Sequence, residues 1–173
     1  MELDKNMVKT FFDFLESFVK WVGYVAALTL ALLIVLVVYD AVMRYLFQSG
    51  SIALQELEWH LFDVVIMLGI AYTLQRASHV RVDIFYDQYS DKVRRIINIL
   101  GALFFILPFS LLIIYVGFDF VMISFDQLEA SSDPGGLSYR FLVKSLLPLA
   151  FFLLIVQTVS EVYKEFVALK EQR

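Results

Sequence analysis

The sequence of 173 residues contains no cysteine, which excludes a disulfide-stabilised scaffold, a thiolate metal site and a cysteine nucleophile. Proline and glycine number only three and seven, so flexible linkers and low-complexity tails have little room. Charged residues make up 18% of the chain, against about 25% in soluble domains. The net charge of −4 argues against a nucleic-acid partner. What the sequence has instead is apolar surface, with 60% hydrophobic residues and a mean hydropathy of +0.74. This composition indicates an integral membrane protein.

Four stretches are long and apolar enough to cross a bilayer as helices, which takes about 20 residues each. The sequence predicts spans over residues 21–45, 56–76, 96–119 and 141–163. The second span is the weakest, because Glu58, His60 and Asp63 lie in its first half. The predicted fold class is therefore all-α, with four transmembrane helices in a single membrane domain over residues 1–173.

Basic residues are concentrated on one side of these spans. Of the 14 lysines and arginines, 11 lie in the N-terminal segment, the connection between the second and third spans, and the C-terminal tail. Only Arg44, Arg140 and Lys144 fall on the other side. The positive-inside rule then predicts that both termini are cytoplasmic, in the inner or cell membrane of a bacterium or archaeon.

Two segments have the amphipathic pattern of helices that lie on a membrane surface. In residues 7–22, apolar and polar side chains fall on opposite helical faces, which predicts an interfacial helix over residues 1–20. The alternative is that this segment is the cytoplasmic start of the first span. Apolar residues from Val82 to Ile96 also recur at helical spacing and predict a short cytoplasmic surface helix over residues 80–95, turning into the third span near Ser90.

Charged residues gather at the outer ends of the first two spans. Asp40 and Arg44 are four residues apart, so they can pair on one helical face. Glu56, His60 and Asp63 also share a face, and Arg44 can meet Glu56 or Asp63 from the neighbouring span. We interpret these residues as a structural ion-pair cluster, with a contact to a partner subunit as the second interpretation.

A catalytic or metal site is the third interpretation of the group Glu56, His60 and Asp63. Zinc binds histidine and carboxylates, but this group has one histidine and no cysteine. The other histidine, His79, is predicted on the opposite side of the membrane, which excludes bis-histidine haem. We therefore expect no catalytic residue, no metal and no cofactor. The spans also lack ionisable residues at their midpoints, so the chain by itself is a poor pump or channel.

Short motifs occur in a definite order along the chain. The first span closes with Asp40-x3-Arg44-Tyr45-x-Phe47, and the second opens with Glu56-x2-Trp59. Within the second span is Leu68-Gly69-x-Ala71, and after it comes His79-Val80-Arg81-Val82-Asp83. Over about residues 20–160, this order and spacing resemble the small membrane subunit of tripartite ATP-independent periplasmic (TRAP) transporters, the DctQ-like family. The loop Ser132-Asp133-Pro134-Gly135-Gly136-Leu137-x-Tyr139-Arg140 is similar to one branch of that family.

The resemblance implies a role within a larger complex. In that family, a large membrane subunit carries out sodium-coupled elevator transport, and a periplasmic substrate-binding protein delivers an organic anion such as a carboxylate or sulfonate. The small subunit is a non-catalytic scaffold for the large one. By analogy, the outer end would be ordered by Arg44, Glu56, Trp59 and Asp63, and the inner turn by His79, Arg81 and Asp83. Interface or structural roles are also expected for Asp40, Asp133 and Arg140.

One detail and two rival hypotheses stay open. The segment from Asp133 to Gly136 is first of all a turn signal, with a contact to the binding protein as the second interpretation. A self-sufficient homo-oligomeric exporter or channel would need Asp63 as its proton carrier. A membrane enzyme would have to use Glu56, His60 and Asp63.

Overall fold

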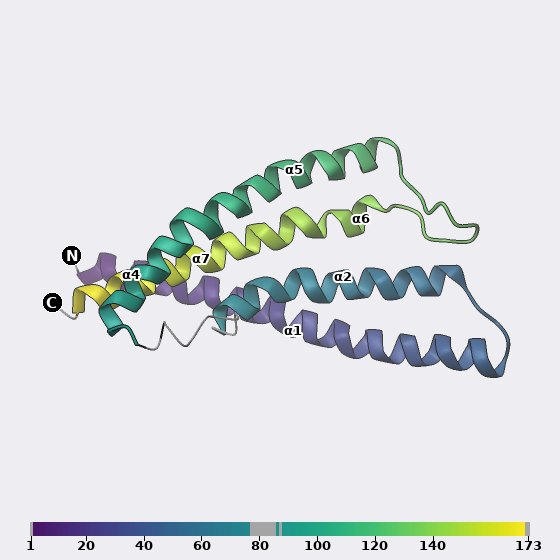
Figure 1. Ribbon diagram of the computed structural model, residues 1–173, viewed down its shortest axis with the longest axis horizontal. Helices are drawn as coiled ribbons and strands as arrows, with labels where there is room; N and C mark the ends of the chain where they lie inside the picture. The colour runs from purple at the N-terminus through teal and green to yellow at the C-terminus, as the bar shows by residue number, and fades with distance from the viewer. Residues whose placement is uncertain (1, 77–85, 87, 172–173) are drawn as a thin grey trace.

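The computed structural model describes residues 2–76, 86 and 88–171, and within them the chain is helical with no strand (Figure 1). The elements are α1 (Glu2–Leu46), α2 (Ile52–Gln75), α4 (Asp91–Gly101), the π-helical segment η1 (Ala102–Ile106), α5 (Leu107–Asp126), α6 (Phe141–Lys144) and α7 (Leu146–Glu171). Four helical stretches are long and apolar enough to cross a membrane: Met7–Leu46, Ile52–Gln75, Asp91–Asp126 and Phe141–Glu171. The predicted all-α class and the predicted number of spans are therefore confirmed.

The helices form two hairpins that lie side by side. Helix α1 pairs with α2, α5 pairs with α7, and α2 packs against α7, so α1 and α5 occupy the two edges (Figure 1). Both chain termini lie at one end of the molecule, which we call the terminal end. The loops over residues 47–51 and 127–140 lie at the opposite end, the loop end. The helices converge at the terminal end, where α1 also reaches α7.

This arrangement leaves a large surface uncovered. The accessible surface is 12013 Å², whereas a compact soluble monomer of 20.0 kDa exposes about 8,700 Å². Large apolar side chains supply much of the exposed surface. More than half of the side-chain surface is exposed for Leu28 and Val35 on α1 and for Phe105 and Tyr115, in the stretch from η1 to α5. Apolar faces of this kind are stable when lipid or another protein covers them and removes them from water.

Small residues allow the helices to approach closely. Gly23 of α1 lies against the ring of Tyr72 of α2, and a Cβ added at Gly23 would overlap that ring. Where α1, α2 and α7 meet, the buried cluster consists of Val19, Val22, Ala71 and Leu153. Close contacts through small side chains are typical of membrane helices, because lipid tails remove the hydrophobic drive for helix association.

Proline explains a break in the fourth span. Pro148 has no N–H to donate to the carbonyl of Lys144, four residues earlier. The α-helical pattern is interrupted at Ser145, between α6 and α7. In the third span, the π-helical segment η1 similarly ends just before Pro108.

The segment predicted as an interfacial helix forms the first turns of α1, which runs unbroken from Glu2 to Leu46. Phe12 stacks on Tyr163 of α7 with ring centroids 4.1 Å apart, and Glu16 pairs with Lys164 of α7 at 2.5 Å. These contacts favour the alternative, in which the segment is the start of the first span. Of the surface helix predicted over residues 80–95, residues 80–85 and 87 lie outside the described residues, and residues 88–90 are not helical. Helix α4 begins directly after Ser90, where the turn was predicted.

Candidate functional site

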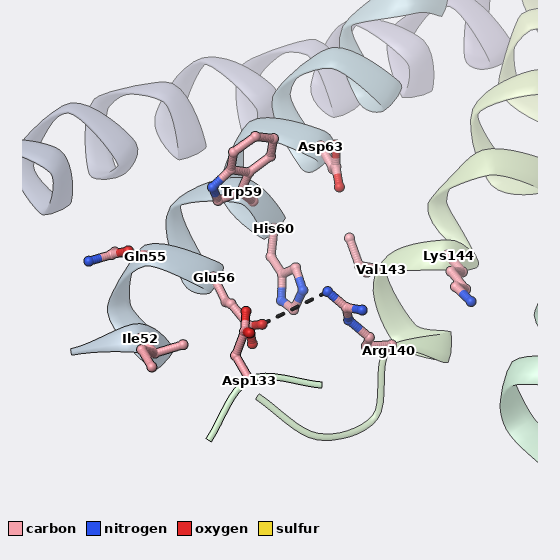
Figure 2. A pocket seen from close by; sticks show the side chains of 10 residues that line it. All are labelled: Ile52, Gln55, Glu56, Trp59, His60, Asp63, Asp133, Arg140, Val143 and Lys144. Atoms are coloured by element: carbon pink, nitrogen blue, oxygen red, sulfur yellow. Dashed lines mark ion pairs between the residues drawn. The ribbon is translucent and has the colours of Figure 1, made fainter. Parts of the chain in front are cut away.

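The loop end contains a polar site built on the first turns of α2. Helix α2 begins after Ser51, whose hydroxyl oxygen accepts a hydrogen bond from the N–H of Leu54 at 3.4 Å. This cap satisfies one of the free donors at the helix start and fixes where the first turn begins. The first turns therefore place Glu56 opposite the loop over residues 127–140 (Figure 2).

Glu56 connects α2 to this loop through three contacts, which we call the Glu56 tie. The Ser131 hydroxyl donates a hydrogen bond to Oε1, and the N–H of Leu137 donates to Oε2 at 2.5 Å. The Nη2 atom of Arg140 lies 3.8 Å from Oε1 (Figure 2). Only 13% of the Glu56 side chain is exposed, so these donors replace most of the water that a free carboxylate would bind.

The loop backbone is shaped so that its donors reach Glu56. The N–H of Ser131 donates to the carbonyl of Leu137 at 2.9 Å, and the N–H of Gly136 donates to the carbonyl of Asp133 at 3.0 Å. The second bond closes the turn predicted over residues 133–136. Gly135 has φ of 86°, a conformation that favours glycine. A Cβ at Gly136 would overlap the Ser131 side chain and Oε2 of Glu56.

A second ion pair joins the same loop to α6. The ammonium of Lys144 pairs with the Glu129 carboxylate and lies 4.2 Å from the centroid of the Phe120 ring. The hydrogen bond from Lys144 lowers the pKa of Glu129 below its ordinary value. The backbone N–H of Arg140 donates to the carbonyl of Glu129 at 2.9 Å. The loop is thus fixed both to α6 and to α2.

The α1–α2 hairpin contains the ion pair predicted between Asp40 and Arg44, which is confirmed. Asp40 is fully buried, whereas 49% of the Arg44 side chain is exposed. Among the residues that the structure describes, no ion pair joins Arg44 to Glu56 or Asp63. The cation that pairs with Glu56 is Arg140.

A cleft of about 480 Å³ opens between α2 and α6 beside the Glu56 tie (Figure 2). Five of the residues singled out from the sequence line it: Glu56, Trp59, Asp63, Asp133 and Arg140. His60 and Lys144 line it too, and Asp40 and Arg44 do not. In the described ranges, no group of three or more His, Cys, Asp or Glu side chains is placed to hold a metal ion.

Three predicted site residues, His79, Arg81 and Asp83, lie outside the residues that the structure describes. The proposed ordering of the inner turn by these residues therefore stays a prediction.

A polar cluster at the terminal end was missed by the sequence analysis. Arg95 of α4 pairs with Glu165 of α7 at 2.7 Å, and the Asn98 side-chain amide donates to the same carboxylate at 2.7 Å. The Gln75 side chain donates to the carbonyl of Glu16 at 2.8 Å, next to the Glu16–Lys164 pair. The paired residues are 59 to 70 positions apart in the first three of these bonds, so no local spacing signals them.

Comparisons with known proteins cover most of the chain. The family model for the DctQ component of tripartite ATP-independent periplasmic transporters matches residues 33–168, which include the loop-end site and the helices from α2 to α6 in full. A Haemophilus influenzae protein named as a TRAP transporter small permease protein is 23% identical over 146 residues, which are 84% of this chain and 87% of that protein. The chain therefore belongs to the DctQ family of tripartite ATP-independent periplasmic transporter components.

Proposed function

We propose that this small TRAP transporter subunit is a non-catalytic scaffold, which braces a large membrane subunit that moves the substrate. The observation that carries the proposal is the open row of helices, whose 12013 Å² of surface includes exposed apolar side chains on α1, α2 and α5. A subunit that worked alone would gain stability by closing its helices into a bundle. A subunit that supports a neighbour needs one of these apolar faces to remain free.

The polar groups of the described residues support the same role. Asp40, Glu56 and Glu129 each pair with a cation of this chain. The Asp40 pair lies within α1, whereas the other two join the loop over residues 127–140 to α2 and to α6. These contacts lie at the loop end, and the others lie at the terminal end. Ion pairs placed in this way fix helices in position and provide no charged path between the two ends.

In the proposed complex, the terminal end is cytoplasmic and the loop end periplasmic, in the inner or cell membrane. Basic residues at the terminal end, including Lys20, Arg76 and Lys164, support this orientation. The large subunit would couple uptake to sodium, and a periplasmic binding protein would deliver an organic anion of the carboxylate or sulfonate class. Membership of the family supports these finer assignments as proposals.

Co-purification and flux measurements test this proposal. The affinity-tagged chain is expressed with a candidate large membrane subunit from the same organism, and separately alone, and both preparations are reconstituted in liposomes. We expect the large subunit to be retained on the tagged chain and radioactive sodium to enter only liposomes that contain it. Sodium or proton flux through the chain alone would contradict the scaffold role, and Asp63→Asn would then show whether Asp63 carries that flux.

A further inference from the structure

One face of α2 combines exposed apolar side chains with a carboxylate. The exposed fractions of Trp59, Phe62 and Ile66 are 73%, 51% and 46%. These residues follow one another at spacings of three and four, so they form one stripe along the helix. Asp63 lies in the same stripe, one turn from Trp59. We call these four residues the α2 face. The opposite side of α2, with Leu68 and Ala71, packs into the cluster with α1 and α7.

Asp63 has no cation of its own. Among the described residues, no hydrogen bond or ion pair reaches its carboxylate, although Arg140 and Lys144 line the same cleft. Both of these cations are already paired, Arg140 with Glu56 and Lys144 with Glu129. Arg44, the third cation near the loop end, is paired with Asp40. Within the described part of the chain, every lysine and arginine near the loop end is therefore already paired.

The position of Asp63 along α2 makes an unpaired charge costly. Helix α2 ends at Gln75, at the terminal end of the molecule. The Gln75 side chain donates a hydrogen bond to the carbonyl of Glu16, beside the Glu16–Lys164 pair. Twelve residues separate Asp63 from Gln75, which is about 18 Å of helix, whereas the hydrocarbon of a bilayer is about 30 Å thick. With Gln75 at the edge of the hydrocarbon, Asp63 would lie within the apolar layer, closer to the middle of the span than the sequence analysis placed any ionisable residue. Ionisable side chains at such depths are normally paired.

Gly69 gives independent evidence that another helix approaches this part of α2. It lies in the interior of α2, where glycine weakens a helix relative to other residues. A Cβ added at Gly69 would meet no atom within 4 Å, in contrast to Gly23, where Tyr72 fills the space. No contact within the described chain therefore requires a glycine here. Small residues in membrane helices allow the backbone of a neighbouring helix to come close.

We propose that the α2 face is the docking site for a transmembrane helix of the large subunit, and that a lysine or arginine of that helix pairs with Asp63. This inference rests on the proposed function, since it needs a large membrane subunit. The unpaired carboxylate of Asp63 favours a neighbour that carries a cation. Lipid tails carry none, and the loop-end cations of a second copy of this chain are already paired. The apolar stretches over residues 21–39 and 96–118 carry no charged side chain, as expected of faces toward lipid.

Photo-crosslinking in the complete complex locates the docking face. A photoreactive phenylalanine analogue replaces Ile66 in the tagged chain, co-expressed with the large subunit, and Leu112 of α5, 56% exposed, is the matched control position. We expect a crosslink from position 66 to the large subunit, identified by mass, and none from position 112. A crosslink from position 66 to lipid or to a second copy of this chain would overturn the inference.

Two substitutions test the chemistry of the contact. Gly69→Leu adds bulk where this chain has open space, and Asp63→Lys places a cation against the proposed cation. Each should reduce the retained large subunit roughly tenfold, whereas Asp63→Glu should retain it. The controls are Gly101→Leu, at another glycine with open space, and Asp126→Lys, at an exposed acid on α5. Both controls should retain the large subunit.

The melting temperature of each variant chain on its own separates a lost contact from a lost fold. Unaltered retention with both Gly69→Leu and Asp63→Lys would overturn this inference and leave the proposed function standing. If the unmodified chain does not retain the large subunit, the proposed function fails and the inference fails with it.

Discussion

The terminal end and the loop end hold their helices together in different ways. At the terminal end, several independent contacts connect the same helices: the Glu16–Lys164 and Arg95–Glu165 pairs, the stacked rings of Phe12 and Tyr163, and the buried cluster of α1, α2 and α7. At the loop end, the two hairpins are connected through the Glu56 tie. One end is therefore redundant, and the other depends on a single carboxylate.

In the proposed scaffold, this difference would fix the helices at the terminal end and leave them adjustable at the loop end. Removing one contact from a redundant set leaves the others to maintain the geometry. Removing Glu56 leaves the loop attached to its own hairpin through Glu129 and Lys144, and frees it from α2. Substitutions at the two ends should therefore differ in kind: those at the terminal end change stability, and those at the loop end change the relative position of the hairpins.

The largest loss of stability is expected from Gly23→Ala, which disrupts the close packing of α1 on α2. The new Cβ would overlap the ring of Tyr72 near its attachment to the backbone, where rotation of the side chain gives little relief. Overpacking of this kind costs roughly 1–3 kcal/mol or more. The midpoint of thermal unfolding in detergent measures it. Gly69→Ala is the matched control, with open space at the new Cβ, and equal midpoints for the two variants would contradict the packing argument.

Glu56→Ala should produce the second largest effect, at the loop end alone. Without the carboxylate, the Ser131 hydroxyl and the Leu137 N–H lose their acceptor, and α2 separates from the loop. Spin labels at Ile52 and Tyr139, both exposed, should report a broader distance distribution with unchanged helix content. The control is Glu58→Ala, on the same helix but without a bond to the loop. A distribution as narrow as in the unmodified chain would show that the tie is dispensable.

Glu165→Ala should have a smaller effect, because the terminal end is redundant. It removes the bonds from Arg95 and Asn98, worth roughly 1 kcal/mol at a partly exposed site, while the Glu16–Lys164 pair remains. Lys164→Met alone should also cost little. Because each contact supports the other, the double variant should lower the unfolding midpoint by more than the two single changes together. Additive changes would contradict redundancy.

The sequence predicts those features of the two ends, and of the helices between them, that depend on local spacing. The four spans follow from bilayer thickness, and the Asp40–Arg44 pair follows from a separation of four residues. Glu56 and Arg140 were also singled out, but their contact was not predicted, nor were the bonds from Ser131 and Leu137, which are 75 and 81 positions away from Glu56. Helical periodicity shows which face a residue occupies and says nothing of which loop covers that face. The paired charges of the terminal end were missed for the same reason.

The smallest expected effect is a weakening of the loop end in acid. The hydrogen bond from Lys144 lowers the pKa of Glu129 in the folded chain below its ordinary value of 4.5. A carboxyl group with a lowered folded pKa contributes stability above its unfolded pKa, and this contribution is lost as the pH falls through the folded pKa. The difference in unfolding midpoint between the unmodified chain and Glu129→Gln should therefore be constant above pH 4.5 and shrink below it.

The size of this difference should be small, because the Lys144 ammonium keeps its place over the Phe120 ring in both chains. Lys144→Met provides the complementary measurement, since it removes the ammonium that lowers the pKa of Glu129. In that background, Glu129→Gln should change the midpoint little at any pH. A difference that persists undiminished well below pH 4.5 would show that Glu129 acts through its shape and backbone contacts and that its charge is not what fixes the loop to α6.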